Sequence, residues 1–411
     1  MVKLSRYFLV AIAILAGSVA IPKLYWIAFE KAPKAPNVMY SCINNDFMIL
    51  KPGDDPIRTD TKGTIYSREE YEQLLPMTYF RQLMSNGTMH DTINGVEMDP
   101  HSLFQSSFFY RYQPKSRYYP EPKLYPMFES ESGRVNLEMP QDFFRIGKRV
   151  EFIDARSNKL NNEKSELFTE ALAEEDFVFP GNLIAGLPTT RKARDDGYFI
   201  TDSNNGLFHI KMVKGEPFVV RVETPENFRI SFIECTEVRN REFYCFVYSA
   251  ANQVYILTQE AYDLVELPIE GFDPKKDELR IQGDIFNRTV AVTSDNRVEV
   301  FVMDDMYEPV DKYSEEWPSL FERTEGKIFS WLFPAEFIAK DKNTGYIRFA
   351  LRVSPGFIWV FLNMIWVGFA IFLIKRRKQN VKNQIPDLAI IAVTGIFGFL
   401  ATLIFPNKFI S

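Results

Sequence analysis

The sequence contains few of the residues and motifs on which catalysis and disulfide scaffolds depend. Its 411 residues include three cysteines and three histidines, and three cysteines are too few for a scaffold held by many disulfides. It lacks a Walker A sequence, a G-x-S-x-G nucleophile elbow, an H-E-x-x-H helix and paired C-x-x-C motifs. We therefore predict no catalytic, cofactor-binding or metal-ligating residue and no cofactor, and a protein that is not an enzyme.

An excess of basic residues is also absent. The formal net charge is −6, which gives no reason to expect nucleic acid as a partner. Hydrophobic residues make up 46% of the chain and aromatic residues 15%, which is far from the composition of a disordered protein. The central part of the chain is long enough to bury a large core as one or two domains.

Long hydrophobic runs occur only at the two ends of the chain. One covers residues 7–29, and two more cover residues 357–374 and 388–405, each 18 residues long. Runs of this length span the hydrocarbon core of a bilayer as helices. The five basic residues of the segment 375–387 precede its single acid, and basic residues in short loops stay in the cytoplasm. We predict three transmembrane helices, with this basic loop and the N-terminus in the cytoplasm.

The first hydrophobic run has two alternative interpretations. Lys3 and Arg6 precede an apolar stretch that ends in the small residues Ser18 and Ala20, as in a cleaved signal peptide. The aromatic residues within 24–29 instead suit the interfacial belt of an uncleaved anchor. In both cases the central region is exported, which predicts a multi-pass protein of the bacterial inner membrane with most of its chain in the periplasm.

Turns centred on asparagine recur in the second half of the chain between strand-like runs. Asparagine and aspartate suit tight hairpins because they tolerate left-handed backbone. The spacings are 47, 47, 44 and 47 residues, between Asn158, Asn205, Asn252, Asn296 and Asn343. A period of 40–50 residues with several short strands is typical of propeller blades. We predict a mainly β, irregular propeller-like domain with repeats over about residues 150–353, in which the first and last blades meet. A β-sandwich with ordinary hairpins is the alternative.

Residues 64–126 are predicted to form a small helical and aromatic insertion. Ser67 and Glu70 have the spacing of a capping box, Pro76 should divide the following helix, and Gly87 should end it. Residues 104–126 are rich in aromatic and basic side chains, which favours a packed edge or a protein-binding surface; an ordinary aromatic core patch is the alternative.

Two further sets of residues are candidates for specific contacts. Cys235 and Cys245 flank a predicted hairpin centred near residue 240, so they lie opposite each other and either form a disulfide or remain two buried thiols. In the membrane segments, Asn363 and the small residues Gly395 and Gly398 favour close helix packing. The two C-terminal runs contain no ionisable residue, so a complete transport pathway is not expected and a partner protein is.

The predicted order of segments follows from these patterns. It is a transmembrane anchor or signal peptide (residues 1–29), a periplasmic β-rich domain (30–355), a transmembrane helix (356–374), a basic cytoplasmic loop (375–387), a transmembrane helix (388–405) and a short periplasmic tail (406–411).

Four short runs resemble an uncharacterised family of bacterial envelope membrane proteins catalogued as a domain of unknown function. These runs are residues 66–76, 124–130, 151–154 and 188–192. The resemblance covers most of the chain but brings no assigned chemistry. Members of such families are often encoded beside an ABC-transporter ATPase, which implies an accessory role in a membrane transport complex. The sequence therefore favours a membrane-anchored periplasmic binding protein that contacts the bilayer and a membrane or periplasmic protein partner. A membrane-tethered periplasmic hydrolase, with its site in the propeller channel, is the alternative.

Overall fold

The chain divides into two compact units, and each is described separately. The computed structural model describes residues 2–31, 34–339 and 343–407. What we call the sheet unit comprises Pro36–Thr293 and Val298–Ser314. The helical unit comprises Met1–Ala35, Ser294–Arg297 and Glu315–Ser411.

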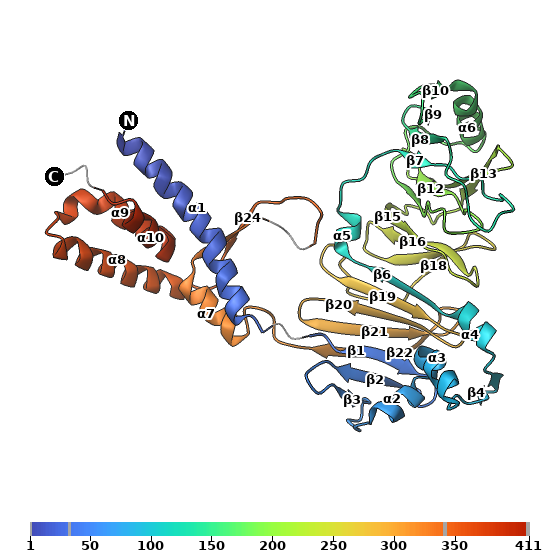
Figure 1. The fold of residues 1–411 in the computed structure, drawn as a ribbon, viewed down its shortest axis with the longest axis horizontal. Helices are drawn as coiled ribbons and strands as arrows, with labels where there is room; N and C mark the ends of the chain where they lie inside the picture. Colours follow the sequence, from blue (N-terminus) through green and yellow to red (C-terminus); the bar gives the residue numbers. More distant parts are fainter. Residues whose placement is uncertain (1, 32–33, 340–342, 408–411) are drawn as a thin grey trace. The chain divides into compact units, whose positions relative to one another are not determined.

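The sheet unit is mainly β and is built from five antiparallel sheets of three to five strands, together with a two-stranded sheet in its helical insertion (Figure 1). The first sheet contains β1 (Asn37–Ser41), β2 (Asp46–Lys51) and β3 (Ile57–Thr59). The second contains β7 (Tyr125–Pro126), β8 (Asp142–Ile146), β9 (Val150–Asp154) and β10 (Leu160–Asn161). The third contains β11 (Ile184–Gly186), β12 (Tyr198–Thr201), β13 (Leu207–Val213) and β14 (Glu216–Val222). The fourth contains β15 (Ile230–Cys235), β16 (Phe243–Ser249), β17 (Val254–Thr258) and β18 (Leu264–Glu266).

The fifth sheet joins distant parts of the chain. Its strand order is β22-β21-β20-β19-β6, so an early strand pairs at the edge of a late meander. The strands are β19 (Glu278–Gly283), β20 (Arg288–Thr293), β21 (Arg297–Met303), β22 (Pro309–Glu316) and β6 (Phe108–Tyr112). The aromatic run that contains β6 is thus a packed edge, with Tyr110 and Tyr112 buried.

Successive sheets pack face to face through aromatic cores. Within β12, Tyr198 and Ile200 face the core shared with the second sheet, whereas Phe199 faces the core shared with the fourth. Side chains alternate between the two faces of a strand, so a strand covered on both faces is hydrophobic throughout. This is why all four residues of β12 are buried.

The first sheet lies against the fifth. Arg280 on β19 donates a hydrogen bond to Asn37 Oδ1 at 3.2 Å, and the rings of Phe47 and Tyr313 lie 5.5 Å apart. The first and fifth sheets of the unit are therefore neighbours, whereas the described strands of the first and last predicted repeats do not meet. The second sheet lies at the opposite end of the stack, with the third and fourth sheets between it and the fifth (Figure 1).

The asparagine turns are confirmed in part. Asn158, Asn205 and Asn252 adopt left-handed backbone, with φ of 51°, 66° and 66°. Asn205 and Asn252 each join the second and third strands of a sheet, but Asn158 joins β9 to β10, which are the third and fourth strands. The first 47-residue interval therefore does not mark equivalent positions. A helix, α6 (Asn162–Glu174), follows β10.

The last predicted repeat is not a blade. Residues 340–342 of its turn lie outside the described residues, and the flanking strands β23 (Ala335–Ile338) and β24 (Ala350–Val353) form a two-stranded sheet in the helical unit. The repeated sheets of the described chain thus end with β22, earlier than the predicted limit of residue 353.

The helical insertion has the helix starts and stops that its sequence predicts. Ser67 and Glu70 form a capping box at the start of α2 (Arg68–Leu74), and Pro76 begins α3 (Pro76–Asn86). Gly87 ends α3 in left-handed backbone with φ 68°. The remaining elements of the insertion are β4 (Thr92–Ile93), β5 (Val96–Glu97), α4 (Pro100–Ser106) and α5 (Pro114–Arg117).

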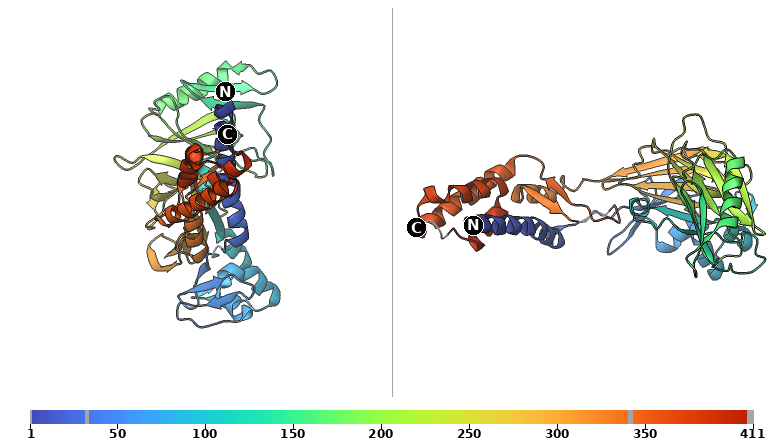
Figure 2. Two further views of the ribbon diagram at one scale, coloured as in Figure 1. Left: turned by 90° about the vertical axis from the view of Figure 1, so that its left-hand side faces the viewer. Right: turned by 90° about the horizontal axis from the view of Figure 1, so that it is seen from above.

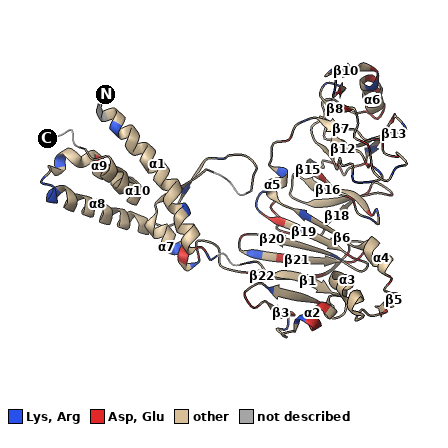
Figure 3. Ribbon diagram, in the orientation of Figure 1, with Lys and Arg blue, Asp and Glu red and all other residues tan. Residues whose placement is uncertain are grey.

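The helical unit contains two helices that are long and apolar enough to cross a membrane, in the part of the chain that the structure describes. These are α1 (Val2–Phe29) and α8 (Ile358–Arg376). Shorter helices complete the unit: α7 (Thr324–Leu332), the 3₁₀ helix η1 (Val381–Gln384), α9 (Ile385–Thr394) and α10 (Ile396–Ile404). In Figure 3 basic residues lie near both ends of α1 and at the C-terminal end of α8, and the middles of these helices carry no charge.

The prediction of a third spanning helix over residues 388–405 is wrong. Gly395 interrupts this run with φ 59° and ψ −129°, so α9 and α10 are separate short helices. The chain then doubles back, because the side chain of Gln384 donates to the carbonyl of Asn407 at 3.3 Å. α10 also packs beside α1 (Figure 2). Hydrophobicity alone could not reveal this break, since glycine is compatible with both arrangements.

Candidate functional site

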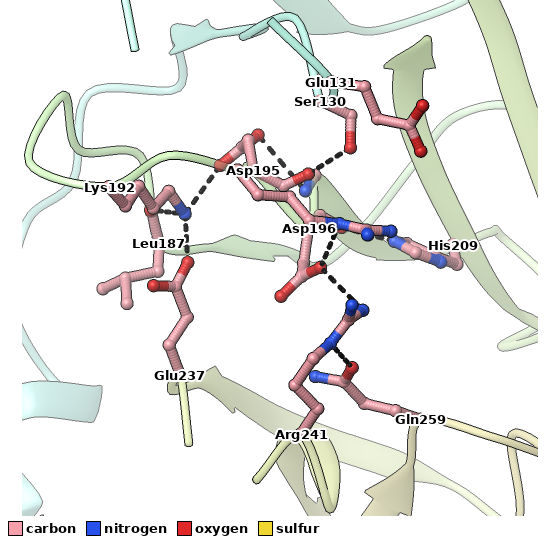
Figure 4. A network of polar contacts seen from close by, with 12 residues as sticks. Ser130, Glu131, Leu187, Lys192, Asp195, Asp196, His209, Glu237, Arg241 and Gln259 are labelled. Carbon is pink, nitrogen blue, oxygen red and sulfur yellow. Dashed lines mark hydrogen bonds and ion pairs between the residues drawn. The ribbon is translucent and has the colours of Figure 1, made fainter. Parts of the chain in front are cut away.

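A polar network in the sheet unit is built on the loop between β11 and β12 (Figure 4). Lys192 Nζ lies 2.8 Å from Asp195 Oδ1 and also contacts Glu237. Ser130 donates its hydroxyl hydrogen to the carbonyl oxygen of Asp195. Burial raises the pKa of Asp195 even though Lys192 opposes the shift. Burial acts to lower the pKa of Lys192, but the two carboxylates outweigh it and raise that pKa.

His209 lies next to this loop, and both nitrogens of its ring have polar partners. Its Nε2 contacts the carbonyl oxygen of Asp196, and its Nδ1 lies 2.8 Å from the hydroxyl of Tyr262. Its ring stacks on Phe199 with centroids 4.4 Å apart. Burial lowers the pKa of His209 to about 4, so the imidazole is neutral near pH 7. Both ring nitrogens have partners, which indicates a structural histidine rather than a general base.

An open cavity of about 870 Å³ with a mixed polar and apolar lining lies next to the network. Glu237 belongs to both features, because it lines the cavity and contacts Lys192. Three arginines, Arg81, Arg191 and Arg239, line the same cavity from α3, from the β11–β12 loop and from the β15–β16 turn. We call it the arginine cavity.

The charges of the arginine cavity are unbalanced. Among the described residues, Arg81, Arg191 and Arg239 have no carboxylate within ion-pair distance, and the single acid of the lining, Glu237, is already paired with Lys192. The guanidinium carbons of Arg239 and Arg81 lie 3.8 and 5.2 Å from the centroid of the Phe104 ring. Because both distances are measured to the same ring centroid, their sum is an upper limit on the distance between the guanidinium carbons of Arg81 and Arg239. Arginines arranged in this way favour an anionic ligand.

The lining also provides apolar contact area. Phe109 on β6 is 62% exposed and lines the cavity together with Phe108. Exposed aromatic and arginine side chains are the residue types that dominate the energetics of protein interfaces. The site thus combines positive charge with aromatic surface, whereas an activated nucleophile is not found among the described residues that line it.

The structure places the two predicted cysteines as expected. Cys235 and Cys245 are direct partners in the register of β15 and β16, and both are free thiols here. Burial raises the pKa of Cys245 well above its ordinary value, and contact with Cys235 adds to the shift. A protonated thiol is a poor nucleophile, so Cys245 is unreactive in this state.

Two of the three predicted membrane-packing residues, Asn363 and Gly395, meet in the helical unit, and the third, Gly398, lies where α10 approaches α9. Asn363 is fully buried on α8 and donates from Nδ2 to the carbonyl of Ala392 at 3.0 Å. A Cβ atom on Gly395 would lie 2.2 Å from Asn363 Oδ1, and one on Gly398 would lie 2.2 Å from Thr394 Oγ1. Close helix packing here depends on glycine at both positions.

Sequence reasoning missed the arginine cavity because its residues come from three distant segments. Two signals in the sequence lay close to it, and the first was the family resemblance. Two of the four runs that carry it meet in the polar network, because Ser130 ends one run and Lys192 ends another. The basic and aromatic composition of residues 104–126 was the other available signal.

A family profile described as a domain of unknown function, DUF4857, matches residues 37–303. The chain belongs to the DUF4857 family. The match covers β1 to β21 and includes the arginine cavity, and it confirms the expectation of an uncharacterised domain. No protein with a curated description matches the chain.

Several solved structures are similar at low identity. The Dos1 propeller has a TM-score of 0.25 at 10% identity, with 56% of this chain and 66% of that chain covered. PorZ, a surface component of the type-IX secretion system of Porphyromonas gingivalis, has a TM-score of 0.22 at 10% identity, with 69% and 27% covered. A prolyl endopeptidase has a TM-score of 0.19 at 11% identity, with 86% and 56% covered. The chain spans less than two thirds of each, and similarity at this level assigns no function.

Proposed function

We propose that this protein is a membrane-anchored binding protein of the bacterial envelope whose exported sheet unit captures an acidic segment of a partner protein. The observation that carries the proposal is the set of three unpaired arginines around one cavity, Arg81, Arg191 and Arg239. An accessory role beside an ABC-type transport complex is the context that the family resemblance suggests. The series of small antiparallel sheets, with the first beside the fifth, supports an irregular propeller-like form for the domain.

The membrane assignment is supported by exposed apolar surface. In the most apolar stretches of α1 and α8, only 17% and 11% of the residues are buried. Exposed apolar helices of this length are stable in a bilayer and unstable in water. Contacts along α1 favour an uncleaved anchor over a removed signal, because Trp26 stacks on Phe329 at 4.5 Å and Arg6 pairs with Asp387.

The doubled-back C-terminal segment suggests a topology that differs from the one expected from hydrophobicity. Arg6 donates to Asp387 Oδ1 at 2.9 Å and to the carbonyl of Phe405 at 2.9 Å. Both ends of the hairpin formed by α9 and α10 therefore lie beside the start of α1. We infer that α9 and α10 enter the bilayer and return to the cytoplasmic side. A C-terminal green fluorescent protein fusion should then fluoresce, and an alkaline phosphatase fusion should be inactive.

Binding at the arginine cavity can be tested on the full chain purified from detergent-solubilised membranes. We compare the wild type with the double variant Arg81→Gln and Arg239→Gln. The matched control is Arg134→Gln with Arg145→Gln, because both of these arginines are exposed on other parts of the sheet unit. The wild type and the control should co-purify a membrane ATPase in a fixed ratio, with ATP hydrolysis in the eluate.

The cavity variant should lose most of this partner, and the binding of the wild type should weaken as salt is raised, since salt screens exposed charges. Equal retention by the cavity variant and the control would contradict the proposal. A purified chain without any partner but with turnover in a panel of hydrolase substrates would instead support the hydrolase. The engaged nitrogens of His209 do not favour that alternative.

A further inference from the structure

The helical unit contains a second cavity that is almost entirely apolar. It has a volume of about 440 Å³, within the range of pockets that hold small molecules (roughly 300–1,000 Å³). Residues of α1, of the β23–β24 sheet, of α8 and of the tip between α9 and α10 line it, among them Leu15, Phe337, Leu351 and Phe397. We call it the apolar cavity.

The shape of the unit explains why the apolar cavity exists. The hairpin of α9 and α10 turns back at Gly395, where it meets Asn363, so it is shorter than α1 or α8. The part of α1 that lines the cavity reaches Ser18, about 18 Å along the helix from Arg6 at the ordinary rise per residue. Beyond the tip of the hairpin, β23 packs on α1, and α7 contacts both α1 and α8. The cavity therefore lies between these helices and the β23–β24 sheet.

The lining would keep water out. Ser18 donates its hydroxyl hydrogen to the carbonyl of Leu15 at 2.8 Å, and Thr394 donates its own to the carbonyl of Ile390 at 2.6 Å. Neither hydroxyl hydrogen needs a ligand, and a dry apolar cavity accepts hydrocarbon rather than water. The indole Nε1 of Trp359 is the exception, since it is buried without a hydrogen-bond partner among the described residues.

Trp359 also lies at a suitable place for an interfacial contact. It is the second residue of α8 and lines the cavity, at the end of the helix next to the exported part of the chain. Tryptophan is enriched at this depth, where its N–H can donate to polar groups of lipids. A phospholipid has an ester carbonyl next to its hydrocarbon chain, which matches a donor at the edge of an apolar cavity.

We propose that the apolar cavity holds an acyl chain of one phospholipid of the outer leaflet, with Trp359 donating to its ester carbonyl. The proposal rests on the membrane anchorage proposed above. The bound acyl chain fills the apolar space between α1, α8 and the β23–β24 sheet. It would therefore remain bound when the surrounding bilayer is removed.

The test is native mass spectrometry of the full chain purified in a mild detergent. The wild type should retain one phospholipid, and Ala11→Trp should lose it because the larger side chain fills the cavity that Ala11 lines. The matched control is Ile12→Trp, at an exposed neighbour on α1 that does not line the cavity. Trp359→Phe should retain less lipid than the wild type, while keeping its aromatic packing.

Circular dichroism and gel filtration show whether each variant is folded. Absence of bound lipid in the folded wild type, or equal retention by folded Ala11→Trp and Ile12→Trp, would overturn the proposal. Carbonate extraction of membranes tests the membrane anchorage separately from the lipid site. A chain released by carbonate would refute the membrane anchorage itself, whereas an integral chain without bound lipid would refute only the lipid site.

Discussion

The two units differ in how far their large apolar side chains are exposed. In the sheet unit, large aromatics such as Phe208 and Tyr248 are fully buried between sheets. In the helical unit, Phe8 and Phe361 are 66% and 72% exposed although they lie on the most apolar helices of the chain. A water-soluble domain gains stability by removing such surface from water, whereas a helix in a bilayer can leave it facing lipid.

Ion pairs differ less between the two units. The sheet unit places most of its ion pairs at or near its surface, where each contributes little. Each unit also contains a buried pair: Lys192 with Asp195 in the sheet unit, with side chains 9% and 2% exposed, and Arg6 with Asp387 in the helical unit, at 7% and 9%. In an apolar surrounding a charge is costly unless it is paired. We expect the sheet unit to depend mainly on hydrophobic packing, and the helical unit, whose large apolar side chains are more exposed, to depend more on a few polar and glycine contacts.

The comparison is tested most strongly by removing one phenylalanine from each unit. Phe208→Ala should lower the free energy of unfolding by about 3–5 kcal/mol, because it leaves a cavity between two sheets. Phe8→Ala should leave thermal unfolding in detergent nearly unchanged, because this side chain packs against little protein. Circular dichroism on heating measures both. Equal destabilisation by the two variants would contradict the contrast.

The buried ion pair gives the second test. Asp387→Asn leaves the charge of Arg6 without its partner, and losses of about 3–5 kcal/mol are typical for one half of a buried pair. Asp55→Asn is the control, because Asp55 is exposed on the sheet unit. Fluorescence-detected gel filtration after heating in detergent should show an earlier loss of the folded peak only for Asp387→Asn. A shift no larger than that of the control would show that the pair is dispensable.

Substitution of Gly395, at the tip of the α9–α10 hairpin, should have a smaller effect on thermal stability. Gly395→Ala forces a side chain into left-handed backbone, which costs about 1–3 kcal/mol, and it places a Cβ atom close to Asn363. Gly368→Ala is the control, because nothing lies within 4 Å of the new Cβ there. Thermal unfolding in detergent should separate the two. If residues 388–405 formed one straight helix, both substitutions to alanine would instead be neutral or stabilising.

The fourth test concerns pH and should have the smallest effect near neutrality. Burial lowers the pKa of His209 from 6.5 to about 4, so between these values the unfolded chain binds more protons than the folded chain. The contribution of His209 to stability is therefore present above pH 6.5 and is lost as the pH falls towards 4. Thermal unfolding at pH 7 and pH 5 measures this loss. His209→Gln, which cannot take up a proton, should show a smaller decrease, and an unchanged decrease would contradict the assignment.

Local features were predictable from the sequence, and long-range ones were not. The capping box at Ser67, the stop at Gly87 and the opposed cysteines depend on residues close in the chain, and the structure has all of them. The pairing of β6 with β19 joins residues far apart, and no local pattern encodes it. The break at Gly395 depends on one backbone conformation within a run that is apolar on both sides.

In the candidate site, too, the local features were predictable from the sequence and the long-range ones were not. Its aromatic and basic composition was visible within residues 104–126, but the three arginines meet only when α3, the β11–β12 loop and the β15–β16 turn are brought together. The resemblance runs identified Ser130 and Lys192 without assigning them a role. The fold was therefore more accessible from the sequence than the site.

The central claim is that the sheet unit lies on the opposite side of the membrane from the cytoplasm. A protease site inserted at Met306, which is 75% exposed in the turn between β21 and β22, tests it directly. We expect cleavage in intact spheroplasts, with a cytoplasmic marker protein left uncut. Cleavage that appears only after the spheroplasts are lysed would contradict the account.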